Sequence, residues 1–170
     1  MGVARTLYER EYMPRRLERR QQSRSERRSS VAVAEKLRFA AGVPALHHLA
    51  LGTARVATVA AFYRDVLELG EVTRHQNGDG TLRAVWLDFQ GVLLMVELSS
   101  EPARRVDGVG AGLFLIAIAV SREEQLRFEA KLVAAGSAIE SRTEWTSYAR
   151  DPDGNRIALS AYPKDLLPRS

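Results

Sequence analysis

Hydrophobic and polar positions follow two different periods along residues 45–163, and the two periods alternate in a regular order. A period of two predicts strands, whereas apolar residues three and four apart predict an amphipathic helix. The first half predicts one strand, one helix and three strands, at residues 45–53, 56–68, 69–75, 82–90 and 92–99. The second half repeats that order at residues 112–121, 122–136, 138–145, 146–150 and 155–162. The chain therefore contains an internal repeat of one supersecondary unit.

The beginning of the chain has a different pattern. Residues 1–30 are rich in helix formers but poor in apolar residues, which predicts a frayed helix or a mobile arm. A short helix is predicted next, ended by Gly42 and Pro44. We therefore expect three segments: a basic arm with a short helix at 1–44, a domain at 45–163 with modules at 45–99 and 112–163, and a tail at 164–170.

The net charge of +4 is distributed unevenly. Residues 1–30 hold nine Arg and four Glu, a net charge of +5, so the other 140 residues sum to −1. One interpretation of the arm is a contact with RNA, an acidic partner or a membrane surface. The other is a solvated tail, or upstream sequence included by a misplaced start codon. The second is favoured because no aromatic residues interleave the charges for base stacking.

Composition narrows the cellular context and the chemistry. The 170 residues include no cysteine, which excludes disulfides and thiolate metal sites and suits a cytoplasmic protein. No apolar run approaches the roughly 18–20 residues that a membrane-spanning helix needs. Because the chain has no cysteine, any metal ion must be bound by His, Asp or Glu.

Two motifs carry a resemblance to a known family. His48 is followed fourteen residues later by Phe62-Tyr63-Arg64-Asp65, and the turn DPDGN at 151–155 precedes the last strand. Together with the internal repeat, they resemble the vicinal oxygen chelate superfamily, which includes glyoxalase I, extradiol dioxygenases and fosfomycin and bleomycin resistance proteins. The resemblance implies an α+β fold with two βαβββ modules whose curved mixed sheets surround a central cavity. It also implies a homodimer, since the family often builds its sites across dimers.

Strand parity assigns side chains to the two faces of each sheet. If Leu49 and Leu51 pack on the helix, His48 points to the opposite face, and the same argument turns Met95 and Glu97 away from the helix. By resemblance, His48 and Glu97 occupy the positions where a glyoxalase-type site supplies two metal ligands. Imidazole and carboxylate would suit Zn, Ni, Mn or Fe.

The second half does not supply the remaining ligands of such a site. Aligning residues 115–120 with 48–53 puts Leu115 where a second histidine would stand, and by resemblance the family's glutamate falls on Ala158. The alternatives without a metal are that His48 is a hydrogen-bonded histidine within a sheet and that Glu97 pairs with His48 or with an arginine such as Arg150.

Parity also predicts the lining of a pocket for a largely apolar molecule. The candidate substrate-binding residues are Trp86, Met95, Leu113, Leu115, Ser160 and Tyr162. The alternative is that these side chains pack a closed core.

Three functions follow from these observations. The first is a protein that binds a small, largely apolar molecule and has a degenerate metal site, with no cofactor or a weakly bound divalent metal. The second is a metal-dependent lyase, isomerase or dioxygenase that uses His48 and Glu97. The third is binding of RNA or an acidic partner through the basic arm.

Overall fold

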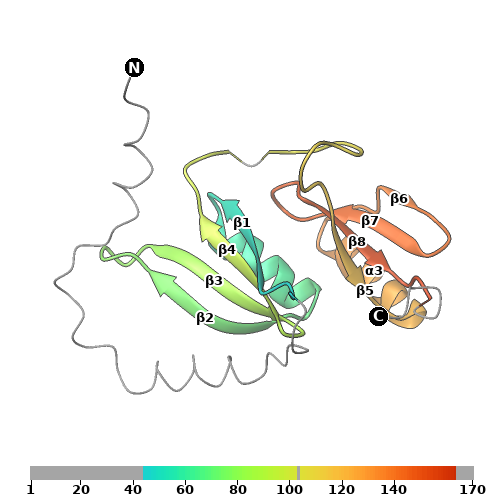
Figure 1. The fold of residues 1–170 in the computed structure, drawn as a ribbon, viewed down its shortest axis with the longest axis horizontal. Coiled ribbons are helices and arrows are strands. Elements are labelled where there is room, and N and C mark those ends of the chain that lie inside the picture. The colour runs from blue at the N-terminus through green and yellow to red at the C-terminus, as the bar shows by residue number, and fades with distance from the viewer. Residues whose placement is uncertain (1–43, 103, 164–170) are drawn as a thin grey trace. The chain divides into compact units, whose positions relative to one another are not determined.

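The computed structural model describes residues 44–102 and 104–163, and these form an α+β fold with two four-stranded mixed sheets (Figure 1). The predicted fold class is confirmed. The predicted basic arm, most of the short helix and the tail at 164–170 lie outside the described residues. In the described part of the chain, no helix is long and apolar enough to cross a membrane.

The first module forms a sheet with the strand order β1-β4-β3-β2. Its elements are β1 (His48–Thr53), α2 (Val56–Ala61), the π-helical turn η1 (Phe62–Val66), β2 (Gly70–Gln76), β3 (Leu82–Phe89) and β4 (Val92–Leu98). β1 runs parallel to β4, and the other pairs are antiparallel. The helix that connects β1 to the rest of the module makes this parallel pairing possible.

The second module repeats this topology with the order β5-β8-β7-β6. Its elements are β5 (Ile116–Ala119), α3 (Arg122–Ala134), β6 (Ser141–Arg142), β7 (Thr146–Arg150) and β8 (Arg156–Ser160). Two strands are each six residues shorter than predicted. The strand expected at 112–121 is reduced to β5, and the one expected at 138–145 is reduced to β6. The pairing of β5 with β8 extends from Ile116 with Ile157 to Ala119 with Ser160. The apolar residues that precede Ile116 are outside this pairing and are not part of the strand.

Local signals in the sequence explain where α3 begins and ends. The Ser121 side chain accepts a hydrogen bond from the Glu124 amide, and the Glu124 carboxylate accepts one from the Ser121 amide. This capping box satisfies two amides that the first turn of a helix leaves without partners. Gly136, with φ of 81°, follows the last turn in a conformation that glycine adopts without strain.

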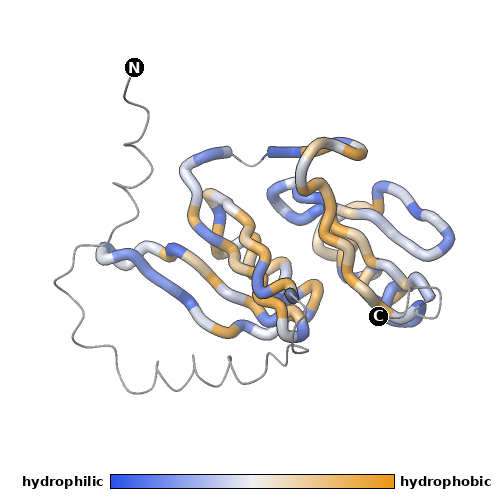
Figure 2. Tube along the Cα trace, in the orientation of Figure 1, coloured by the Kyte–Doolittle hydropathy of each residue, from blue (hydrophilic) through white to orange (hydrophobic). Residues whose placement is uncertain are grey.

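One face of each sheet packs against its helix, and the core lies there. Leu51, Leu94 and Val96 of the first sheet and Ile157 and Leu159 of the second belong to the same buried cluster. Figure 2 shows hydrophobic positions along the central strands, whereas the loop of the β6–β7 hairpin is mostly hydrophilic. We call the face of each sheet that points away from its helix the open face. The alternation predicted for β1 and β4 is confirmed except near the two ends of β4, where Leu93 of the open face is buried and Leu98 is exposed.

Candidate functional site

The open face of the first sheet carries the chemical groups that the sequence analysis singled out in that module. On β1, His48, Ala50 and Gly52 are exposed, and on β4, Met95 and Glu97 are half-buried. Strand pairing arranges the side chains in rows across the sheet. The middle row contains Ala50, Met95, Trp86 and Thr73, and the next row contains Gly52, Glu97, Ala84 and His75.

Trp86 is the largest side chain in the middle row. Its ring lies 4.7 Å from the His75 ring, centroid to centroid, at an angle of 56°. The indole Nε1 is buried, and no acceptor for its hydrogen lies within bonding distance among the described residues. A buried donor without an acceptor costs about 1–3 kcal/mol, and a ligand or water that reached this indole would recover that cost.

Glu97 lies one row further along, and small residues flank it on both sides. It pairs with Gly52 on β1 and with Ala84 on β3. Among the described residues, none donates a hydrogen bond to the Glu97 carboxylate and none forms an ion pair with it. The alternative that Glu97 pairs with Arg150 is wrong, since Arg150 binds Asp107, Glu140 and two backbone carbonyls instead.

His48 and Glu97 do not form the metal site that the resemblance suggests. His48 pairs with Leu93, four positions before Glu97, which places their Cα atoms roughly 13 Å apart along the strands. The His48 Nδ1 lies 2.9 Å from the Nδ1 of His47, which is a contact available to a histidine that binds no metal. Among the described residues, no group of three His, Asp or Glu side chains could hold a metal ion. Within residues 44–102 and 104–163, the side chains therefore do not fit a metal centre.

The open face of the second sheet lacks metal ligands at the corresponding positions. Ala158 is fully buried between Ala117 and Tyr148, and Leu115 precedes β5. The strand pairing also changes which residue of the second module corresponds to Glu97 of the first. Ala119 corresponds to Gly52 in the repeat, and Ala119 pairs with Ser160, so the counterpart of Glu97 is Ser160 rather than Ala158. The Ser160 hydroxyl lies 3.2 Å from the Thr146 hydroxyl, as two neutral groups sharing one hydrogen bond.

The predicted lining residues do not come together within this chain. Trp86 and Met95 are paired neighbours on the first sheet, whereas Ser160 lies on the second. Leu113 and Tyr162 are 66% and 47% exposed. The prediction that these residues bind one ligand therefore needs a second surface to complete the cavity.

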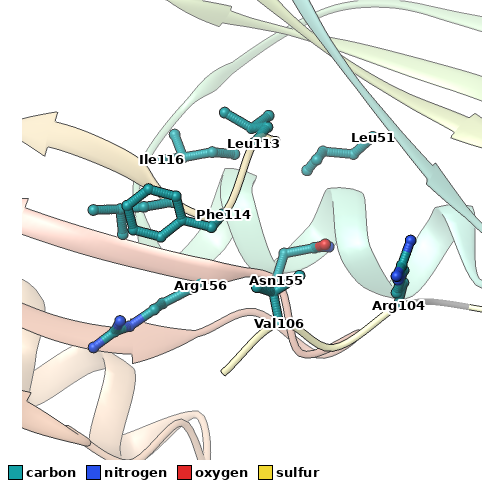
Figure 3. A pocket seen from close by; sticks show the side chains of 9 residues that line it. Leu51, Arg104, Val106, Leu113, Phe114, Ile116, Asn155 and Arg156 are labelled. Atoms are coloured by element: carbon teal, nitrogen blue, oxygen red, sulfur yellow. The ribbon is translucent and has the colours of Figure 1, made fainter. Parts of the chain in front are cut away.

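A separate hollow of about 340 Å³, part of it open solvent, includes two of the predicted residues. It is lined by Leu51, Arg104, Val106, Leu113, Phe114, Leu115, Ile116, Asn155 and Arg156. Figure 3 shows Leu51 and Leu113 across from Asn155 and Val106. The Asn155 side chain donates to Asp151, and the Arg156 guanidinium stacks over the Tyr148 ring at 4.6 Å, although the buried Arg156 Nε has no hydrogen-bonding partner among the described residues.

The two motifs that carry the family resemblance contact each other. The Tyr63 hydroxyl donates to Asp151 at 3.1 Å, and Arg55 donates to Asp153 at 2.5 and 3.0 Å. Burial, and then the negative charge of Asp151, raise the pKa of Tyr63 well above its usual value. These motifs therefore join the two modules.

His75 is the functional candidate that the sequence analysis did not select. The sequence pattern places His75 at the end of the strand predicted at residues 69–75. Only the pairing of β2 with β3 puts it in the same row as Glu97. The short hairpin at 77–81 predicts that the two strands pair, but the register shift between His75 and Gln76 hides the row of His75 from the sequence.

Comparison with known proteins identifies the family. A sequence profile of the Glyoxalase/Bleomycin resistance protein/Dioxygenase superfamily matches residues 45–159. The chain therefore belongs to this superfamily, which confirms the resemblance. No curated protein matches the chain.

Several solved structures share the fold. A fosfomycin resistance protein, FosX, from Listeria monocytogenes, solved with Mn(II) and 1S,2S-dihydroxypropylphosphonic acid, is 16% identical with a TM-score of 0.61, covering 72% of this chain and 96% of its own. Lactoylglutathione lyase from Agrobacterium tumefaciens is 20% identical with a TM-score of 0.52, covering 70% and 94%. TioX from Micromonospora sp. ML1 is 20% identical with a TM-score of 0.53, covering 71% and 100%. At these identities the likeness shows the fold alone.

Proposed function

We propose that this protein binds a small, largely apolar molecule on the open face of its first sheet, and that its own side chains build no metal centre there. The observation that carries the proposal is the row of Ala50, Met95 and Trp86, in which an aromatic ring and a thioether lie half-buried beside an exposed alanine. An aromatic and a methionine side chain form an adaptable apolar surface.

Two polar groups on this face can orient the bound molecule. The Trp86 Nε1 donates and the Glu97 carboxylate accepts, and among the described residues neither group has a hydrogen-bonding partner. Ligand pockets typically combine an apolar lining with a small number of such polar points. A ligand with an apolar body and a donor at one end would satisfy this arrangement.

We also propose that the chain forms a cytoplasmic homodimer in which the second sheet of one copy covers the first sheet of the other. The support for a dimer is that both open faces expose small residues, Ala50 and Gly52 on β1 and Ala117 and Ala119 on β5. In such a dimer, Ser160 and Tyr162 of one copy would complete the pocket around Trp86 of the other. A mass of two chains by light scattering is the expected result, and a single-chain mass would contradict the dimer.

The metal-dependent lyase, isomerase or dioxygenase has less support. FosX was solved with Mn(II), but its 16% identity transfers no ligand residues to this chain. His48 and Glu97 lie too far apart along the paired strands for the pair that the resemblance implied. A weakly bound divalent metal is therefore not needed for the binding proposed here.

The proposal is tested by NMR on ¹⁵N-labelled, EDTA-treated protein titrated with small aromatic fragments. The expected result is that chemical shifts change at the Trp86 indole N–H and at the amides of Ala50 and Met95, and that Trp86→Leu abolishes these changes. Shifts confined to the hollow around Leu113 and Asn155, with none at Trp86, would refute the proposed location.

A further inference from the structure

We propose that the molecule bound by the first sheet carries a cationic group, either a protonated amine or a guanidinium, which binds between the Glu97 carboxylate and the Trp86 ring. This inference rests on the proposed function, because it concerns the same face of the same sheet. It specifies the class of ligand, which neither the family nor the fold determines.

The state of Glu97 is exceptional among the carboxylates of the described residues. Five of these carboxylates belong to residues that are at least partly buried: Asp88, Glu97, Glu129, Asp151 and Asp153. The other four have partners, since Asp88 accepts from the Gly91 amide, Glu129 pairs with Arg142, Asp151 accepts from Tyr63 and Asp153 pairs with Arg55. Glu97 is half-buried, but its carboxylate oxygens are not among the fully buried atoms, so they are free to pair with a cation supplied by a ligand.

The charge of the surrounding face favours a cation. Strand pairing places twelve residues on the open face of the first sheet: His48, Ala50, Gly52, Gly70, Thr73, His75, Ala84, Trp86, Asp88, Leu93, Met95 and Glu97. Two of these are carboxylates, and none is lysine or arginine. An anionic ligand would meet repulsion here, whereas an ammonium or guanidinium group would find a charge of opposite sign.

The geometry places an aromatic ring beside the carboxylate. Glu97 pairs with Ala84 on β3, and Trp86 lies two positions further on the same strand, so Glu97 and Trp86 are diagonal neighbours. Diagonal neighbours on one face are about 7–8 Å apart, which leaves room for a small cation between them. A cation within about 6 Å of a tryptophan ring centroid is attracted by the ring, and tryptophan is the best of the aromatic residues for this contact.

Three substitutions and three probes test the inference in the full-length protein. Trp145→Phe leaves Trp86 as the chain's one tryptophan, so that fluorescence reports on the site. The Trp145 backbone carbonyl, which accepts hydrogen bonds from Gln125 and Ala161, is kept in this variant. The probes are benzylammonium, benzyl alcohol and phenylacetate, which share an aromatic body and differ in charge. The expected order of affinity is benzylammonium, then benzyl alcohol, then phenylacetate.

Glu97→Gln in the same background removes the charge and keeps the shape. We expect the dissociation constant for benzylammonium to rise about tenfold and that for benzyl alcohol to stay within a factor of about two. Glu101→Gln is the matched control, since Glu101 is exposed and lies after the end of β4. This control should change neither constant.

The outcomes separate the two proposals. If all three probes bind equally and Glu97→Gln changes nothing, the apolar site stands and the cationic ligand is refuted. If phenylacetate binds most tightly, the cationic ligand is also refuted. If none of the probes changes Trp86 fluorescence, both the cationic ligand and the proposed site are refuted.

Discussion

The hydrogen bond between Tyr63 and Asp151 joins the two modules, and Tyr63→Phe removes it without changing the volume of the ring. Tyr63 is fully buried and Asp151 is 5% exposed, so water cannot replace the lost donor. The carboxylate keeps three other hydrogen bonds, from the backbone amides of Asp153 and Asn155 and from the Asn155 side chain.

These contacts set the size of the effect. A hydrogen bond to a charged group contributes about 1.5–3 kcal/mol, and the three remaining donors place the loss toward the lower end of that range. We therefore expect Tyr63→Phe to lower the free energy of unfolding by about 1.5–2 kcal/mol. That loss corresponds to a decrease in Tm of about 6–8 °C for a body of this size.

Urea unfolding followed by circular dichroism measures the difference, and Tyr148→Phe is the matched control. Tyr148 is half-buried, and among the described residues its hydroxyl has no hydrogen-bonding partner, so its removal should cost less than about 0.5 kcal/mol. Equal stabilities of Tyr63→Phe and wild type would refute the idea that this bond joins the modules.

The pH dependence gives an independent check on the same residue. The raised pKa of Tyr63 means that the unfolded chain loses its proton near pH 10 while the folded chain keeps it. Stability from this group is therefore complete below pH 10 and is lost as the pH rises further. The difference in stability between wild type and Tyr63→Phe should shrink above pH 10, and a difference that stays constant to pH 11 would contradict this cause.

Three further variants test other parts of the account. Glu68→Gln removes the carboxylate that pairs with Arg127. Hydrogen bonds from Arg127 and then Lys131 lower the pKa of Glu68 to about 2. The variant should therefore have a lower free energy of unfolding than wild type at pH 7, and the difference should vanish as the pH falls from about 4.5 to about 2. Gln125→Ala removes the buried amide that donates to the Ser147 hydroxyl at 2.9 Å, and should cost about 2–3 kcal/mol in urea unfolding, whereas a loss below 0.5 kcal/mol would contradict the role of this amide. Ser121→Ala should cost about 1 kcal/mol by removing the cap of α3, and an unchanged Tm would exclude that role.

Features that depend on local patterns were predictable from the sequence. The alternation of Leu49 and Leu51 with His48 and Ala50 assigned the faces of β1 correctly, because each side chain's direction follows from its immediate neighbours. The repeat of one strand, one helix and three strands was confirmed for the same reason. The length of β5 was not predictable, since the apolar run at 112–115 does not reveal where its ladder with β8 begins.

The candidate site depended on distances between side chains, which the alternation of side chains along a strand cannot predict. Parity placed His48 and Glu97 on the same face, but the four positions between them appear only when the register of β1 against β4 is known. His75 was missed because its place beside Trp86 depends on the register of β2, which contains irregularities on both sides of the contact. Register is set by turns and bulges together with the hydrophobic pattern.

The most direct test of the central claim is the dissociation constant of benzylammonium for the full-length Trp145→Phe variant, measured by Trp86 fluorescence in EDTA and again with excess Zn, Ni, Mn or Fe(II). A site built from Trp86, Met95 and Glu97 without a metal centre predicts the same constant in all five solutions, within a factor of about two. Binding that appears only with a metal, or becomes more than about tenfold tighter, would contradict the claim and would restore the metal-dependent enzyme as the first candidate.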